Sequence, residues 1–425
     1  MNRTQAPKVF DAVEFNLQLK PYTQFNLDNG VPVYTINAGA EEVIMLEFVF
    51  YAGNWYEEKN IVAATTNFLL KNGTQTKNAF AINEHFDFYG AYLTTNCYNE
   101  TATVTLHTLA KHLPKLLPVI AEILTQSVFP EDEIAIYKQN QKQKLKVNLK
   151  KCDFVANRLI DEYVYGIHHP YGKYTTEKDY DSIDRNEIIN FYNEYYTHGK
   201  CLLFVAGKLP NDIQQQLNNV FGSLPFNQNK NIEKQIQELP SSQKQYNIIN
   251  DEKDVQAAIR IAEHFPNRHH PDFQKVQVLN TVFGGYFGSR LMSNIREDKG
   301  YTYGIHSFIQ NHIHDTAWII STEAGRDVAA ATIDEVYKEM KLLQKELIDE
   351  EELNLVRNYM IGSILGDLDG PFPVIARWKN YILNGLDEKY FYNGINIIKT
   401  VTAEELQQLA QKYLQPEKFY ELTVI

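Results

Sequence analysis

Cysteine is scarce in this chain, and so are long apolar runs. The only cysteines are Cys97, Cys152 and Cys201, which are too few and too scattered for a disulfide framework or a cysteine-based zinc site. No stretch reaches the ~18 to 20 apolar residues that span a bilayer, and no apolar segment typical of a signal peptide follows Arg3. We therefore expect reduced cysteines, no membrane partner and a cytoplasmic protein.

Positive charge is also in deficit. The chain has 41 lysines and arginines against 53 aspartates and glutamates, so its net charge is −12. Because nucleic acids and anionic membranes attract basic surfaces, this balance argues against either as a general partner. With 425 residues, of which 44% are hydrophobic, the chain is long enough for two or more globular domains.

The chain contains an internal repeat. Residues 90–124 and 304–340 each show an alternating strand, an acidic residue followed by Thr-Ala, a second strand and an amphipathic helix. The two acidic-Thr-Ala triplets are residues 100–102 and 315–317. The recurrence of the same elements in the same order predicts that one structural unit occurs twice.

The helices after the repeat also correspond. Residues 129–145 and 347–364 each begin with acidic residues and continue with apolar residues at helical spacing. The order of elements predicts an α+β fold of two homologous domains, each a largely antiparallel sheet with helices packed on one face. We place these domains at 1–224 and 246–425, joined by a polar, proline-bounded linker at 225–245.

Three stretches give the chain a resemblance to a known family. Residues 73–107, 117–134 and 283–307 resemble the M16 peptidases, the pitrilysin or insulinase family, and the likeness extends over nearly the whole chain. It is closest to the branch built from single two-domain subunits of this length. The resemblance implies two homologous α+β domains joined by a linker, with two subunits closing around a peptide.

Active members of that family carry the motif H-x-x-E-H on a helix just before a Gly-Thr turn. Its two histidines, at i and i+4, bind zinc on one helical face, its glutamate is the general base, and a distant glutamate completes the site. Counting back from Gly73, the resemblance places the motif at Ala64, Asn67 and Phe68. None of these side chains can bind zinc or accept a proton.

The neighbouring sequence offers no replacement ligands. No histidine occurs in residues 1–84, and no carboxylate lies between Glu133 and Asp153, where the distant glutamate is expected. We therefore predict a degenerate zinc site, with no metal and no cofactor in this chain, and we expect zinc in a partner subunit that carries H-x-x-E-H.

The second signature of the family is present. In active members, an arginine and a tyrosine seven residues apart reach from the C-terminal domain to the zinc site, and Arg296 and Tyr303 have this spacing. Arginine supplies a permanent charge with forked donors, and a tyrosine hydroxyl can donate to a developing oxyanion. The resemblance therefore implies a catalytic role for both residues, in trans, at the site of the partner.

A glycine-containing segment precedes this pair: Gly284, Gly285, Gly288, Ser289 and Arg290. It matches the corresponding segment of the family, and its glycines would allow a substrate or partner to approach the backbone closely. We expect these five residues to bind substrate or partner. The segment matches neither a P-loop nor a complete Rossmann fingerprint.

One run contains several residue types that bind metals. Glu263, His264, His269 and His270 stand close together, but prolines interrupt the run and the i, i+4 helical geometry of a zincin site is missing. We interpret the run as a solvated loop.

Two histidine pairs need their own interpretation. His312 and His314 share one strand face by alternation, and we interpret them as exposed hairpin residues. His168 and His169 lie in a loop that resembles one in the family, and we interpret them as structural or partner-facing.

Several functions remain open from the sequence. The leading hypothesis is a non-catalytic subunit of a heterodimeric zinc peptidase, which gives Arg296, Tyr303 and half of a peptide-binding chamber to an H-x-x-E-H partner. The alternative is a non-enzymatic protein that binds peptide or unfolded polypeptide, or a scaffold, possibly homodimeric. An independent hydrolase ranks third, because no local nucleophile motif is visible.

Overall fold

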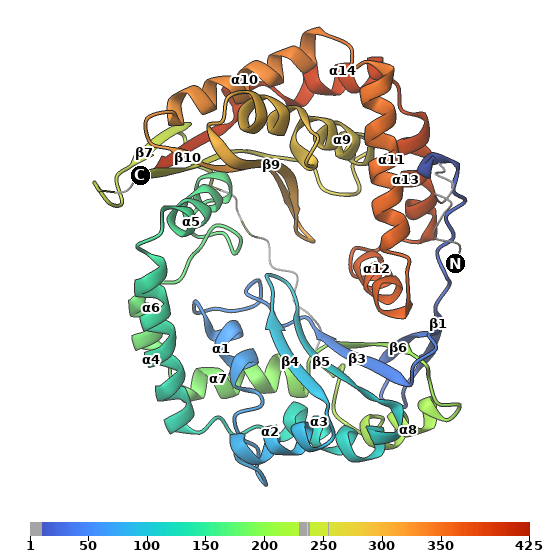
Figure 1. Cartoon of the computed structure of the whole chain (residues 1–425). Helices are drawn as coiled ribbons and strands as arrows, with labels where there is room; N and C mark the ends of the chain where they lie inside the picture. The colour runs from blue at the N-terminus through green and yellow to red at the C-terminus, as the bar shows by residue number, and fades with distance from the viewer. Residues whose placement is uncertain (1–10, 229–235, 237–238, 254) are drawn as a thin grey trace, which may run out of the picture.

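Two β-sheets, each with its own set of helices, organise the chain (Figure 1). The computed structural model describes residues 11–228, 236, 239–253 and 255–425. The first sheet has six strands in the order β1-β2-β6-β3-β5-β4, and the second has five in the order β7-β11-β8-β10-β9.

The strands of the first sheet are β1 (Thr23–Asn26), β2 (Pro32–Asn37), β3 (Val43–Phe50), β4 (Tyr92–Cys97), β5 (Ala102–Leu109) and β6 (Cys201–Gly207). Those of the second sheet are β7 (Gln245–Ile248), β8 (Gln256–His264), β9 (Thr302–Asn311), β10 (Thr316–Gly325) and β11 (Tyr420–Val424).

The helices of the first half are α1 (Val62–Leu69), α2 (Ala79–Phe88), α3 (Leu113–Gln126), α4 (Glu131–Asn148), α5 (Cys152–Tyr165), α6 (Glu177–Ser182), α7 (Arg185–Tyr192) and α8 (Ile213–Phe221). Those of the second half are α9 (Phe273–Asn280), α10 (Ala329–Lys345), α11 (Glu350–Gly366), α12 (Pro371–Leu383), α13 (Glu388–Thr400) and α14 (Ala403–Tyr413). None of the helices within the described ranges is long and apolar enough to cross a membrane.

The two sheets have corresponding topologies. Without its edge strand β1, the first sheet reads β2-β6-β3-β5-β4, and the second sheet follows the same path as β7-β11-β8-β10-β9. In each sheet one pair of strands is parallel, β2 with β6 and β7 with β11, and the other pairs are antiparallel. The hairpin β4–β5 followed by α3 corresponds to β9–β10 followed by α10. These correspondences confirm the predicted α+β duplication.

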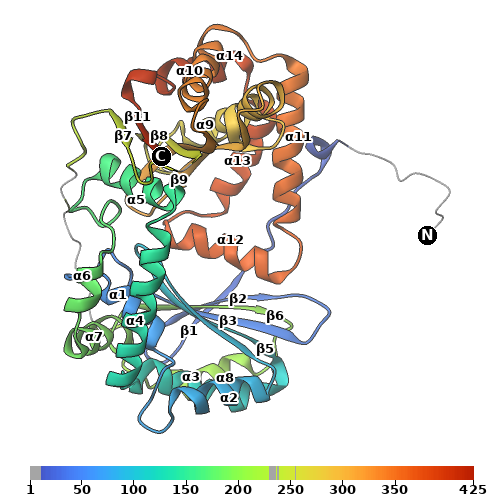
Figure 2. The same cartoon turned by 60° about the vertical axis from the view of Figure 1, so that its left-hand side comes forward.

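One helix from each half packs against the sheet of the other half. α5 contacts β8 and β11, whereas α12 contacts β6 and β2, and Figure 2 shows α12 lying over the first sheet. Accordingly, Ile36 and Phe204 of the first sheet belong to the core of the second half, and Ala262 and Leu422 of the second sheet belong to the core of the first half. Because this packing buries apolar surface that either half would otherwise expose, it stabilises the pairing of the halves.

The predicted linker lies only partly within the described residues. Residues 229–235 and 237–238 of the segment 225–245 fall outside them. The domain limits at 224 and 246 therefore stay a prediction.

Candidate functional site

A buried carboxylate holds the start of α1, the helix that would carry the zinc motif. Glu57 accepts hydrogen bonds from the backbone N–H groups of Ile61 and Ala63 at 3.2 and 2.9 Å, which are free donors at a helix start. Its Oε1 lies 2.6 Å from Nζ of Lys173, and the Glu57 side chain is 1% exposed. Burial raises the pKa of Glu57, and the charge and hydrogen bond of Lys173 oppose that rise. The contacts fix α1 in place.

At the three zinc-motif positions, α1 carries side chains that serve packing. Asn67 is 2% exposed, and its Nδ2 donates to the carbonyl of Thr103 at 3.3 Å and to the hydroxyl of Tyr196 at 3.1 Å. Ala64 is half-buried. Phe68 is 48% exposed, so one side of its ring faces solvent.

The helix α4, where the distant zinc ligand was expected, contributes an aromatic contact at this place. The ring centroid of Tyr137 lies 4.9 Å from that of Phe68, and the Tyr137 hydroxyl accepts a hydrogen bond from Thr65 at 3.4 Å. Burial raises the pKa of Tyr137 to about 12, so the phenol is neutral at pH 7. Among the described residues, no three His, Cys, Asp or Glu side chains come together in a way that could hold a metal ion.

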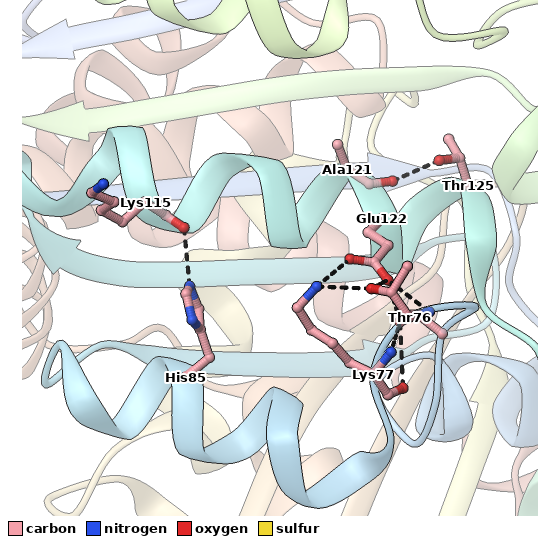
Figure 3. Close-up of polar contacts among 8 residues, drawn as sticks. Thr76, Lys77, His85, Lys115, Ala121, Glu122 and Thr125 are labelled. Carbon is pink, nitrogen blue, oxygen red and sulfur yellow. Dashed lines mark hydrogen bonds and ion pairs between the residues drawn. The ribbon is translucent and has the colours of Figure 1, made fainter.

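The turn after α1 is tied to α3 through Glu122 (Figure 3). The Glu122 carboxylate accepts from the hydroxyls of Thr74 and Thr76, each at 2.5 Å, and from Nζ of Lys77 at 2.7 Å. Burial by itself raises the pKa of Glu122, but hydrogen bonds from Lys77 and the two threonines outweigh it and lower the pKa to about 2. The Gly-Thr turn of the family pattern therefore has a structural role in this chain.

Arg296 and Tyr303 are presented at the surface. Tyr303 is 93% exposed, at the start of the edge strand β9. Nε of Arg296 donates to the Tyr303 carbonyl at 3.1 Å, and the guanidinium carbon lies 4.5 Å from the centroid of the Phe287 ring. The Arg296 side chain is 34% exposed, and its Nη1 lies 3.5 Å from Glu297. The arginine thus holds the backbone of Tyr303 while the phenol extends into solvent.

The glycine-containing segment before this pair packs against β9. A Cβ added to Gly284 would lie 2.6 Å from Cβ of Ser307, so glycine is needed there for close packing. Ser289 is buried, and Arg290 forms a two-pronged ion pair with Glu352 at 2.8 and 2.7 Å. For these residues, and for Gly285 and Gly288 beside them, the binding of substrate or partner stays a prediction.

The structure brings together a group of residues whose association the sequence does not reveal. The turn between β4 and β5 meets the turn between β9 and β10, where Oε1 of Glu100 accepts from the backbone N–H of Ile313 at 2.9 Å. Each turn contains the acidic residue of one of the two acidic-Thr-Ala triplets of the repeat, Glu100 or Asp315. The Tyr171 hydroxyl also donates to Glu100, so the loop 166–172 joins the same contact. Correspondence between the turns was visible in the sequence, whereas their contact was not.

Three histidines lie around this contact. We call the group of side chains here the junction cluster, which consists of Trp55, Glu100, His169, Tyr171, His312 and His314. The His312 ring stacks on Tyr171 and the His314 ring on Trp55, each with centroids 4.0 Å apart. The expectation of exposed hairpin residues is therefore wrong for His312, which is half-buried, and is confirmed for His314, which is exposed although its ring stacks on Trp55.

The other histidine interpretations fare differently. His169 is 3% exposed and accepts from the backbone N–H of Tyr171 at 3.2 Å, which fits a structural role, and burial lowers its pKa to about 4. Glu263 and His264 belong to strand β8, so the predicted solvated loop is wrong for them. His264 pairs with Asp315 at 2.5 Å.

Comparisons with known proteins identify the family of this chain. Residues 33–169 match the family model "Insulinase (Peptidase family M16)" and residues 182–360 match "Peptidase M16 inactive domain". A Bacillus subtilis protein named uncharacterized zinc protease YmxG is 23% identical over 92% of this chain and 95% of its own length. A Helicobacter pylori protein named non-peptidase homolog YmxG is 20% identical over 87% of this chain and 86% of its own length.

The fold is also similar to solved structures. The crystal structure of a peptidase M16 inactive domain from Pseudomonas fluorescens superposes with a TM-score of 0.85 at 21% identity, covering 95% of this chain and 98% of that one. The two family models match consecutive segments that together cover most of the chain. The chain therefore belongs to the M16 peptidase family, as a member without the H-x-x-E-H motif that retains the arginine and tyrosine of the C-terminal half.

Proposed function

We propose that this chain is the non-catalytic subunit of a two-chain M16 zinc peptidase. Its partner carries H-x-x-E-H and the zinc, and this chain contributes Arg296, Tyr303 and half of a chamber that binds peptide or unfolded polypeptide. Neither chain cleaves peptides without the other, since the metal and the Arg–Tyr pair lie on different subunits.

The exposure of Tyr303 carries this proposal. A tyrosine that is 93% exposed has little part in the core, and exposed aromatic side chains commonly mark binding surfaces. Its backbone is nevertheless held by Arg296 at 3.1 Å. A fixed position with a free hydroxyl suits a residue that acts on another molecule.

The two side chains would have different tasks at the site of the partner. The Tyr303 hydroxyl would donate a hydrogen bond to the peptide oxygen that gains negative charge when the peptide bond is attacked. Arg296 would bind the substrate backbone through its charge and remaining donors. Free edges at β4 and β9 also offer backbone groups with which an extended peptide can pair.

Reconstitution with the H-x-x-E-H partner tests the proposal. Losing one preorganised oxyanion donor typically costs on the order of 100- to 1000-fold in turnover. We therefore expect Tyr303→Phe to lower kcat by about this factor with KM nearly unchanged, and Arg296→Ala to impair both. Tyr392→Phe, at another exposed tyrosine (43%) on α13, is the matched control and should leave kcat unchanged.

Full activity of the Arg296→Ala/Tyr303→Phe double variant would contradict the proposal. In that case the second candidate, a peptide-binding or scaffold protein without enzymatic activity, would stand. The name of the Helicobacter pylori relative, a non-peptidase homolog, favours that candidate.

A further inference from the structure

One cavity of the chain includes neither α1 nor the Arg296–Tyr303 pair in its lining. It has a volume of 420 Å³ and is lined by residues of α9, α12 and α13 and of the segments beside them, among them Arg268, Arg377, Tyr381 and Tyr390. We call it the α12 pocket. Its volume lies within the ~300 to 1,000 Å³ typical of small-molecule sites.

Arg268 lacks a carboxylate partner among the described residues. Its side chain donates to the Oδ1 of Asn380, on α12, and no described acidic side chain forms an ion pair with it. Burial lowers the pKa of Arg268, although a guanidinium remains charged at neutral pH. A partly buried charge with unused donors is costly unless an anion binds it.

Arg377 adds a second positive charge to the same wall. Its Nη2 lies 2.9 Å from Oδ2 of Asp367, but this carboxylate is 64% exposed, so the pair is a weak one. Its Nη1 donates to the Tyr381 hydroxyl at 3.3 Å. The lining residues include two arginines and one aspartate, and the charge of Glu100, which is not part of the lining, also acts on Arg268.

A second cavity, with a partly apolar lining, adjoins the α12 pocket. It has a volume of 280 Å³ and shares Gln277, Arg377, Tyr381 and Tyr390 with the larger one. Its remaining lining combines the apolar side chains of Met360, Ile364, Phe391, Ile395 and Ile398 with the polar side chains of Gln274, Thr281 and Ser363. A ligand can therefore place a charged group beside the arginines and an apolar group among the apolar side chains.

We propose that the α12 pocket and the adjoining cavity bind a carboxylate that carries an apolar tail. The carboxylate would accept hydrogen bonds from the guanidinium of Arg268, with Arg377 nearby, because planar forked donors match planar carboxylates. The tail would enter the adjoining cavity and lie against its apolar side chains. Two arginines offset by nearby carboxylates suit a monoanion better than an inorganic phosphate dianion, which has no tail to bury.

Calorimetric titration of the full chain with acetate, hexanoate, octanoate and inorganic phosphate tests the site. Each buried methylene contributes about 0.8 kcal/mol, or roughly a fourfold gain in affinity, so octanoate, with two more methylenes, should bind about 15-fold more tightly than hexanoate. Acetate and phosphate should bind far more weakly. Equal affinity for all four anions, or binding of none of them, would overturn the proposal.

Variants of the lining residues measure the contributions of the carboxylate and of the tail separately. Arg268→Gln should weaken octanoate binding about 10- to 100-fold, the value of a charge-assisted hydrogen bond. Arg326→Gln is the control, because Arg326 is an exposed arginine that donates to the Glu252 carbonyl, outside the pocket. Ile364→Gln should reduce the difference between octanoate and hexanoate. Unchanged octanoate affinity in Arg268→Gln, with circular dichroism confirming an intact fold, would overturn the assignment.

The same carboxylate can belong to a free acid or to the C-terminus of a peptide with an apolar last residue. A pentapeptide ending in leucine, as its free acid and as its amide, distinguishes these sources. Binding of the free-acid peptide in competition with octanoate, and not of the amide, would assign the pocket to peptide ends. Displacement of octanoate by neither form would assign it to free acids.

Discussion

Two regions of this chain differ in what they retain of the M16 pattern. In the first half, the zinc-motif positions on α1 hold Asn67, which is buried and hydrogen-bonded, and Phe68, which contacts Tyr137. In the second half, Tyr303 is almost fully exposed. In the first region, side chains that stabilise the fold occupy the positions of the zinc ligands and the general base. The second region retains a side chain that adds little stability. This contrast predicts that substitutions in the two regions have different consequences.

The largest effect should come from returning an acid to the general-base position. Asn67→Glu introduces a carboxylate at a site that is 2% exposed and faces the Thr103 carbonyl. An unpaired buried carboxylate destabilises the fold, because it either stays charged without hydration or must take up a proton at pH 7. We expect the free energy of unfolding at pH 7 to fall by about 4 kcal/mol or more, as measured by urea denaturation.

Phe68→Glu is the matched control, since it introduces the same charge one residue further along α1. Phe68 is 48% exposed, so this variant should lose about 1 kcal/mol or less. Equal losses in the two variants would contradict the inward-facing role of position 67.

The buried ion pair at the start of α1 should have the next largest effect. Lys173→Met leaves Glu57, whose side chain is 1% exposed, without its counter-charge, and breaking such a pair typically costs about 3 kcal/mol or more. The double variant Glu57→Gln/Lys173→Met should recover part of the loss in chemical denaturation. A single variant as stable as the parent would show that α1 does not depend on this pair.

A smaller effect should appear on acidification, through the junction cluster. Burial lowers the pKa of His169 from 6.5 to about 4, so between these values the unfolded chain binds a proton that the folded chain does not. The contribution to stability is therefore present above pH 6.5 and is lost as the pH falls to 4, by roughly 2 to 3 kcal/mol.

Unfolding curves recorded between pH 7 and pH 4 measure this loss. His169→Gln should remove this part of the slope of stability against pH, whereas His168→Gln, at the exposed neighbour, should retain it. The same slope in all three proteins would assign the pH dependence to other groups.

The smallest effect on stability should come from the Arg–Tyr pair. Tyr303→Phe removes a hydroxyl from a side chain that is 93% exposed, so the free energy of unfolding should change by less than about 0.5 kcal/mol. Thermal denaturation of the parent and the variant checks this value. A loss of several kcal/mol would mean that the phenol serves the fold, which would remove the contrast between the two regions.

Much of the fold follows from local sequence patterns. The alternation in 102–109 and 316–325 gives β5 and β10, and the acidic starts at Glu131 and Glu350 open α4 and α11. Such patterns repeat within one element, at period 2 for a strand and 3.6 for a helix. The absence of zinc ligands was equally readable, because the ligands of a zincin helix are four residues apart in sequence.

The sequence by itself determined the duplication, the degenerate motif at 64–68 and the spacing of Arg296 and Tyr303. Only the tertiary structure decided that α5 and α12 pack against the opposite sheets, that the two repeat turns meet at the junction cluster, and that Arg268 and Arg377 share one pocket. The reason is physical. Periodicity tells which face of an element is apolar, but the partner of that face depends on the shape and burial of segments hundreds of residues apart, which no local pattern encodes.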